Sequence, residues 1–118
     1  MNFKITLPLP PPTNRIYRSG YSKIKGRSFL YKSDEAKAWM DEVGYLIKAK
    51  CHKPTKEPVG VIVYWFFKIE ADIDGRLKPL LDVLQGLVIE NDSQIIELHV
   101  YKKIGELRPE VNIEILTI

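Results

Sequence analysis

Two aspartates in the second half of the chain have the type and spacing of metal ligands. Asp72 and Asp74 are separated by one residue at the end of an apolar segment. In an extended chain, side chains at positions i and i+2 point to the same face, so the two carboxylates are predicted to converge. Adjacent carboxylates repel each other, and a hard divalent cation would offset that repulsion. Mg²⁺ suits such a site because it takes oxygen ligands, keeps several waters and uses one or two carboxylates with a substrate phosphate.

Three further side chains are candidates for the same chemistry. Asp92, in a polar turn, is the candidate third carboxylate. Lys78 follows Asp74 by four residues, so one helical turn would return its ammonium to the same side. There it could hold an attacking water or stabilise charge on a phosphoryl group in the transition state. Asp82, another four residues on, is predicted to pair with Lys78 rather than to reach the metal.

Ordinary structural roles remain open for each of these residues. One of two aspartates before a helix is often only an N-cap, and Asn and Asp are common turn residues. A single lysine is most often solvated. Other reaction types have less support, because the chain has no Ser/His/Asp order and no phosphate-binding glycine motif. His52 and His99 are predicted to be surface or strand residues rather than ligands.

Charge is distributed unevenly along the chain. The net charge is only +3, but residues 1–56 carry 12 basic and 4 acidic side chains, whereas residues 57–118 carry 6 basic and 11 acidic ones. A basic first half joined to an acidic second half predicts a polyanion-binding surface beside a carboxylate-rich site.

The basic charge is concentrated in residues 14–32, which contain no acid. Aromatic side chains are interleaved with the basic ones there, at Tyr17, Tyr21, Phe29 and Tyr31. Basic groups neutralise phosphates and aromatic rings stack on unpaired bases, so the segment is a candidate for nucleic-acid binding. A flexible, solvated loop is the alternative. The basic residues of the segment are Arg15, Arg18, Lys23, Lys25, Arg27 and Lys32.

The elements that must position these residues are predicted from periodicity. Residues 2–7 alternate as a first strand, which the prolines of residues 8–12 end. Ser33 is a predicted N-cap, and the helix after it has a buried stripe of Ala36, Trp39, Met40, Val43 and Ile47. Residues 14–32 are expected to be irregular, with short strand character at Ser28–Tyr31.

The second half is predicted to contain a strong strand, a helix and two further strands. Residues 59–69 are almost continuously apolar, which is typical of a strand covered on both faces, by helices on one and by a partner subunit on the other. A helix is expected from about Asp74 to Leu87, beginning later or in a distorted turn because of Pro79. Residues 94–103 and 109–118 are expected to pair as a hairpin. The pattern indicates one α+β domain over residues 1–118, with a small mixed sheet and two main helices.

Several classes of protein are excluded or disfavoured by composition. The longest apolar run, residues 61–67, is far shorter than the roughly 18 residues of a membrane span. One cysteine, Cys51, excludes an internal disulfide framework and fits a reducing cytoplasm. No signal peptide is recognisable, so a cytoplasmic location is expected.

The motifs resemble those of the RusA-type Holliday junction resolvases. The resemblance rests on the segment DIDGRLKPLLDVLQG at residues 72–86 and on NDSQI at residues 91–95. The early proline-rich turn with Asn14, the basic segment and the helix after Ser33 match the family's order of elements, so the resemblance covers nearly the whole chain. Gly75 and Asn91 depart from the family, which often has Asn and Asp there, and both lie beside the predicted site.

This resemblance implies a Mg²⁺-dependent, homodimeric endodeoxyribonuclease of α+β fold that resolves four-way DNA junctions by paired symmetric nicks in recombination and repair. Such enzymes often come from prophages and act in the cytoplasm of a bacterial or phage-infected cell. By position, Asp72, Asp74 and Asp92 would be the metal-binding catalytic acids and Lys78 the catalytic lysine, with Mn²⁺ as an alternative metal. The implied DNA-binding residues are Asn14, Arg15, Arg18, Lys23, Lys25, Arg27, Lys32 and Arg76.

Two other functions are compatible with the same residues. One is a general Mg²⁺-dependent nuclease acting on flaps or other branched DNA. The other is a DNA-junction-binding module without catalysis, in which the acids serve as caps and surface charge.

Overall fold

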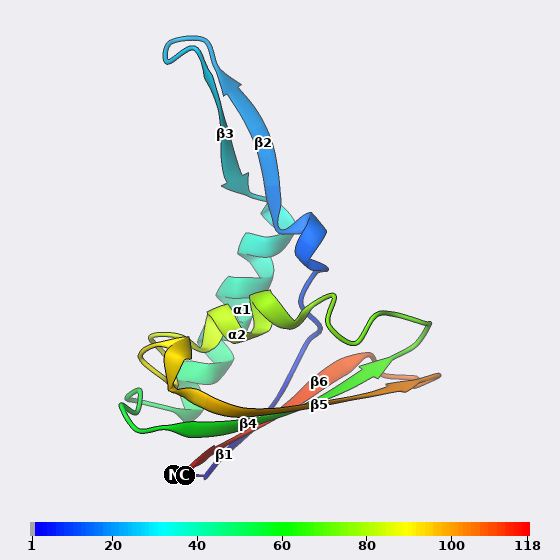
Figure 1. Ribbon diagram of the computed structural model, residues 1–118. Helices are drawn as coiled ribbons and strands as arrows, with labels where there is room; N and C mark the ends of the chain where they lie inside the picture. Colours follow the sequence, from blue (N-terminus) through cyan, green and yellow to red (C-terminus); the bar gives the residue numbers. More distant parts are fainter. Residues whose placement is uncertain (1) are drawn as a thin grey trace.

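A four-stranded mixed sheet forms the base of the molecule (Figure 1). The computed structural model describes residues 2–118, with Phe29 described by its backbone alone. The strands lie in the order β1-β6-β4-β5, where β6 is antiparallel to both β1 and β4, and β5 is parallel to β4. Their bounds are β1 Asn2–Leu7, β4 Val59–Phe67, β5 Ile95–Ile104 and β6 Glu110–Thr117. The predicted α+β class with a mixed sheet and two helices is therefore confirmed.

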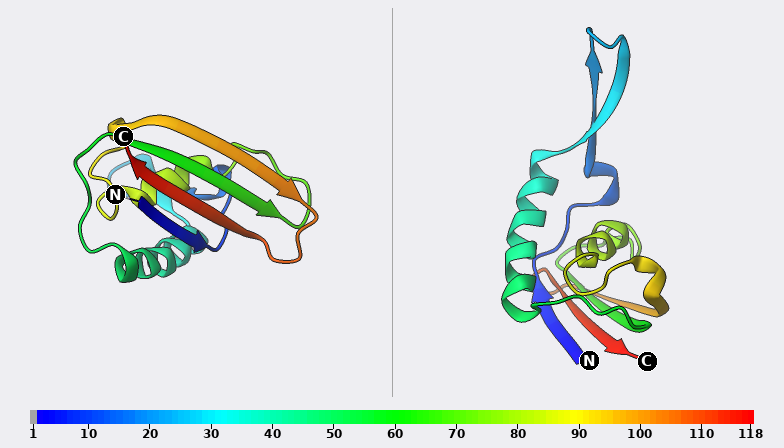
Figure 2. Two further views of the ribbon diagram at one scale, coloured as in Figure 1. Left: turned by 90° about the horizontal axis from the view of Figure 1, so that it is seen from below. Right: turned by 90° about the vertical axis from the view of Figure 1, so that its left-hand side faces the viewer.

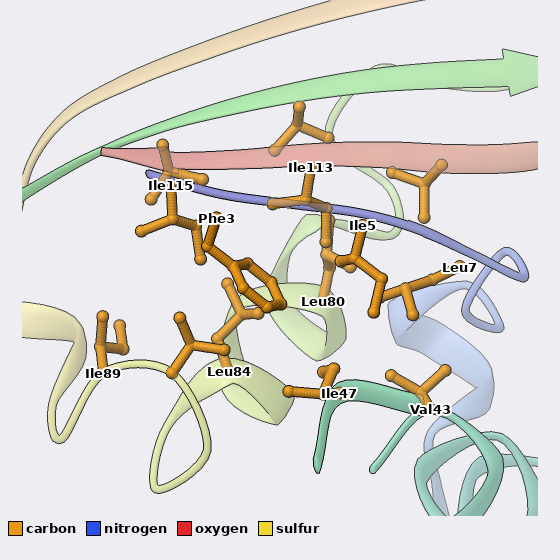
Figure 3. Close-up of a cluster of buried hydrophobic side chains, with 14 of the residues drawn as sticks. Phe3, Ile5, Leu7, Val43, Ile47, Leu80, Leu84, Ile89, Ile113 and Ile115 are labelled. Atoms are coloured by element: carbon orange, nitrogen blue, oxygen red, sulfur yellow. The ribbon is translucent and has the colours of Figure 1, made fainter. Parts of the chain in front are cut away.

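Two helices cover one face of this sheet, α1 (Asp34–Lys50) and α2 (Leu77–Leu84) (Figure 1). Alternate side chains of the strands point toward the helices. Figure 3 shows these side chains packed between the sheet and the two helices. Ser33 caps α1 as predicted, accepting a hydrogen bond from the Ala36 amide at 3.1 Å. The predicted stripe of α1 is buried except Met40, which is partly buried. The labelled core residues in Figure 3 are Phe3, Ile5, Leu7, Val43, Ile47, Leu80, Leu84, Ile89, Ile113 and Ile115.

The expected hairpin of the last two strands is wrong. β5 and β6 lie on opposite sides of β4 and do not pair with each other. The reason is the helix between β4 and β5: a strand, a crossover helix and a second strand place the two strands parallel and side by side. The central position of β4 also explains its almost continuous apolar sequence, because its inward side chains are fully buried and those on the other face are half-buried.

Helix α2 is shorter than predicted at both ends. It begins at Leu77, so Pro79 falls in the first turn, where a missing N–H is tolerated. The chain turns away after Leu84, and Gly86 adopts a φ of +83° that a side chain would disfavour. Leu80 and Leu84 are fully buried, so α2 is fixed to the sheet along this face.

Residues 17–32 form a β-hairpin rather than an irregular segment. β2 (Tyr17–Ser22) pairs antiparallel with β3 (Arg27–Lys32), and Gly26 supplies a φ of +63° at the turn. The hairpin projects well beyond the sheet and helices (Figures 1 and 2). Hydrogen bonds at its base hold it to the domain, since Ser33 donates its amide to the Ile16 carbonyl and its hydroxyl to that of Arg15, both at 2.8 Å.

The face of the sheet away from the helices has no cover within the described residues. The predicted partner subunit on that face therefore stays a prediction. Among the helices of residues 2–118, none is long and apolar enough to span a membrane.

Candidate functional site

The loop between β4 and α2 carries the two aspartates predicted as metal ligands. Residues 73–76 form a bend and a turn, and Asp72 just before them is not part of a strand. The premise that Asp72 and Asp74 share one face of an extended chain is therefore wrong. Asp74 lines a cavity of about 340 Å³ together with Lys78, Asp82 and Asp92. Asp72 instead lines a different open cleft of about 580 Å³, together with Gly75 and Arg76.

The structure thus brings Asp74, Lys78 and Asp92 to one cavity and places Asp72 beside it. Within the described part of the chain, no group of three or more His, Cys, Asp or Glu side chains is arranged to hold a metal ion. The side chain of Asp74 also does not cap α2, whose first turn lacks a side-chain cap. The capping alternative is therefore excluded for Asp74 at α2.

Lys78 is held in this cavity by Asp82. Its Nζ lies 3.4 Å from Asp82 Oδ2, one turn further along α2, so the predicted pairing is confirmed. Gln85 connects Asp82 with the turn of Asp92: its amide nitrogen donates to Asp82 Oδ1 at 3.5 Å, and its amide oxygen accepts from the Asp92 amide at 3.3 Å. Gln85, at the end of α2, therefore helps to position both Asp82, the partner of Lys78, and the turn that carries Asp92.

Gln94 fixes the turn that presents Asp92. Its side-chain oxygen accepts the amides of Glu90 and Asn91 at 2.8 and 2.9 Å. Its side-chain nitrogen donates to the carbonyls of Thr55 and Glu57 at 2.9 and 2.8 Å. These four hydrogen bonds tie the short turn of Asp92–Gln94 to the loop before β4. The side chain of Asp92 is exposed.

Arg76 connects the same loop to the proline-rich segment. Its Nε donates to the Pro10 carbonyl at 2.9 Å, and its guanidinium lies 5.5 Å from the centre of the Phe67 ring. Burial lowers the pKa of Arg76 from its ordinary value, repulsion from Arg15 adds to the lowering, and Glu35 opposes it. These contacts give Arg76 a structural role, and its predicted contact with DNA stays a prediction.

Sequence reasoning missed one contact that anchors the loop on its other side. Lys102 Nζ, from β5, lies 2.6 Å from Glu70 Oε1 and donates to the Ala71 carbonyl at 2.9 Å. Ala71 immediately precedes Asp72, so this lysine ties the loop to the sheet next to the first aspartate. The hydrogen bond and charge of Lys102 lower the pKa of Glu70 below its ordinary value of 4.5. The pairing is therefore present above the ordinary pKa of Glu and is lost as the pH falls through the lowered value.

Replacing Lys102 with Met is expected to raise the pKa of Glu70 back toward 4.5, because both main causes of the shift are removed. NMR titration of the Glu70 carboxyl checks this. Lys48→Met is the matched control, since Lys48 is an exposed side chain of α1 and belongs neither to the loop nor to β5. An unchanged Glu70 pKa would contradict the contact.

The side chains of the acidic cavity fit a hard divalent cation. Mg²⁺ needs only one or two carboxylates from a protein, with waters and substrate phosphate completing its coordination. Asp74 and Asp92 supply two such carboxylates on one open cavity, and both side chains are exposed. Asp72 precedes Asp74 by two residues and lines a different cleft. The carboxylate oxygens of the cavity are therefore ligands of the chemical type that Mg²⁺ takes.

The predicted DNA-binding residues lie mainly on the projecting hairpin. Arg18, Lys23, Lys25, Arg27 and Lys32 belong to it and are exposed. Asn14 and Arg15 lie in the 3₁₀ turn at its base, where Arg15 Nη2 is 4.0 Å from Glu35. Tyr17, Tyr21 and Tyr31 are also exposed on the hairpin, whereas the Phe29 side chain lies outside the described residues.

A cavity lined by carboxylates and a lysine, on a domain with an exposed basic hairpin, suits a protein that binds nucleic-acid backbones and acts on them. Residues 8–116 match the model of the RusA endodeoxyribonuclease family, and the chain belongs to this family. The family acts on Holliday junction DNA. No curated protein matches the chain.

Proposed function

We propose that this protein is a Mg²⁺-dependent, structure-selective endodeoxyribonuclease that resolves Holliday junctions by paired symmetric nicks. The observation that carries the proposal is the cavity shared by Asp74, Lys78 and Asp92 in a chain of the RusA family. A cytoplasmic location and a role in DNA recombination and repair go with this function.

Each residue of the cavity has a role in the proposed reaction. Asp74 and Asp92, with Asp72 beside them, would hold Mg²⁺ or Mn²⁺. When bound, the metal supplies Lewis acidity and makes a bound water more acidic. The Lys78 ammonium, kept in place by Asp82, stabilises negative charge that develops on the phosphoryl group. The expected products are a 5′-phosphate and a 3′-hydroxyl.

A homodimer follows from the geometry of the substrate. A four-way junction has two scissile strands related by approximate two-fold symmetry, so a two-fold dimer supplies one acidic cavity to each. The basic hairpins would neutralise phosphates around the junction, and such backbone contacts recognise a branched shape without base-specific readout.

Cleavage of three labelled substrates tests the proposal: a mobile four-way junction, a flap and a linear duplex, each with Mg²⁺ and with EDTA. The expected result is two symmetric nicks in the junction, dependent on Mg²⁺, with little cleavage of the duplex. Equal rates on all three would contradict junction selectivity and favour a general nuclease. Tight junction binding without nicking at any protein concentration, with Mg²⁺ or Mn²⁺, would favour a non-catalytic binding module.

A further inference from the structure

Strand β5 is an exposed edge of the main sheet. Within the described residues it pairs with β4 on one side and with no strand on the other. At the opposite edge, α1 runs beside β1, whereas β5 lies open along its length (Figure 2). Long open edges attract further strands, and β5 has apolar side chains that stay exposed. These are Ile96, Leu98, Tyr101 and Ile104, with 58%, 40%, 53% and 37% of their surface exposed.

The sequence of β5 is complementary to itself when read in the opposite direction about Val100. Antiparallel pairing centred on this residue places Ile96 opposite Ile104, and Glu97 opposite Lys103. Val100 faces its own copy. Each isoleucine near an end of the strand thus lies opposite another isoleucine, and each charged residue beside it lies opposite a residue of the other charge.

In this register, residues that lie opposite each other must also have their side chains on the same face of the sheet. Leu98, Val100 and Lys102 pair with residues of β4 that point toward the helices, so they share that face. Glu97, His99 and Lys103 pair with residues of the other face. Directly opposite residues always share a face in an antiparallel pair, and the Glu97–Lys103 pairs and Val100 satisfy this condition. Ile96 lies at a bulge of β5, between Ile95 and Glu97, where no residue of β4 is opposite it.

We propose that β5 pairs antiparallel with β5 of a second copy of this chain, about a two-fold axis at Val100, and so joins the two sheets into one. The inference deepens the proposed function and rests on it, because that function requires an enzyme of two subunits. The interface is isologous, as two-fold symmetry requires, because each contact between two different residues occurs twice. Two pairs of opposite charges fix the register, and Val100 meets its own copy at the axis.

This arrangement places the two acidic cavities on the same face of the joined sheet. The two-fold axis is perpendicular to the sheet, so α2 of both subunits lies on one side. Lys102 belongs to β5 and holds the loop of Asp72 through Glu70 and Ala71. Each interface strand therefore supports the metal-binding loop of its own subunit, close to the axis that relates the two scissile strands of a junction.

Charge reversal tests the register without DNA or metal, so its outcome is independent of nuclease activity. Sedimentation equilibrium gives the dimer dissociation constant of the wild type, E97K, K103E and the double variant. Each single variant places like charges opposite each other twice per dimer, and we expect dissociation constants about 10-fold higher. The double variant restores opposite charges and should return to within about 3-fold of the wild type.

E114K is the matched control, because Glu114 is paired with Lys4 on the uncovered face of the sheet, away from β5. It should leave the dimer unchanged. A dimer weakened by E114K but not by E97K would overturn the proposal in favour of that face. A wild type that is monomeric at about 100 μM, or a double variant that stays as weak as the singles, would also overturn it. Neither result would alter the cleavage assays that test the proposed function.

A disulfide provides a second, geometric test. In a C51A background, V100C places two thiols on directly opposite residues, whose Cα atoms are about 4.5–5.5 Å apart and within bonding range. Mild oxidation with diamide should give a covalent dimer. Y101C is the control, because its two copies are diagonal neighbours at roughly 7–8 Å, too far to bond. Cross-linking of Y101C but not of V100C would overturn the proposed register.

Discussion

Asp74→Asn is expected to lower the rate of junction cleavage by about 10³-fold or more, while junction binding changes little. The asparagine keeps the size of the side chain but removes the negative charge that would hold the metal. Because the Asp74 carboxylate is exposed on an open cavity and does not cap α2, the fold should be unaffected. Single-turnover cleavage with Mg²⁺ gives the rate, and gel-shift titration without metal gives the affinity. We expect the same result for Asp72→Asn.

Two matched variants show whether this effect is specific. Asp41→Asn removes an exposed carboxylate from α1 and should cleave at the wild-type rate. Asp82→Asn removes the partner of Lys78 within the same cavity, so we expect an intermediate loss. Full activity of Asp74→Asn would remove this residue from the mechanism. An equal loss of binding and cleavage would assign it to DNA contact or to the fold.

Local patterns were sufficient to predict those parts of the fold that depend on neighbouring residues. The Ser33 cap, the buried stripe of α1 and the central strand all depend on periodicity within one segment, and the structure has them. The partner of β5 could not be predicted in this way. Two apolar strands near the end of a chain suit a hairpin equally well, and only the packing of α2 between β4 and β5 selects the parallel arrangement.

The hairpin of residues 17–32 was missed for a different reason. Its two strands bury almost nothing, so their sequence lacks the alternation of apolar and polar residues that identifies a half-buried strand. Two local signals were present: the strand character expected at Ser28–Tyr31, which lies within β3, and the turn glycine, Gly26.

Of the predicted site residues, Asp74, Lys78 and Asp92 come to one cavity in the structure, but the residues that hold them in place were not predicted. Gln85 contacts residues close to it in the chain, whereas Gln94 also reaches the carbonyls of Thr55 and Glu57 in the loop before β4. A side-chain amide in a polar turn gives little warning of either role. Lys102 acts across the sheet, and its contact with Glu70 depends on the register of β5 against β4. Strand register is a long-range property that a single sequence specifies only through the complete fold.

Neutralising the hairpin is expected to weaken junction binding strongly without affecting the fold. The variant replaces Arg18, Lys23, Lys25 and Arg27 with Gln. If each of these four contacts one phosphate, the slope of log affinity against log salt concentration should fall by about three to four, and affinity near 0.1 M salt by roughly 10³-fold. The melting temperature should stay unchanged, because all four side chains are exposed and outside the core.

The control must remove the same charge from another surface, because loss of net charge alone weakens long-range attraction to DNA. Replacing Lys37, Lys48, Lys53 and Lys56 with Gln does this on α1 and the loop after it, where all four side chains are exposed. A salt slope lowered equally in both variants would mean that the hairpin contributes only net charge. A slope lowered in the hairpin variant alone, with the cleavage rate at saturating protein preserved, would separate the group that binds DNA from the group that cleaves it. The hairpin projects from the domain (Figures 1 and 2), whereas Asp74 lies in the loop between β4 and α2 and Asp92 in the turn before β5, so the fold itself predicts this separation.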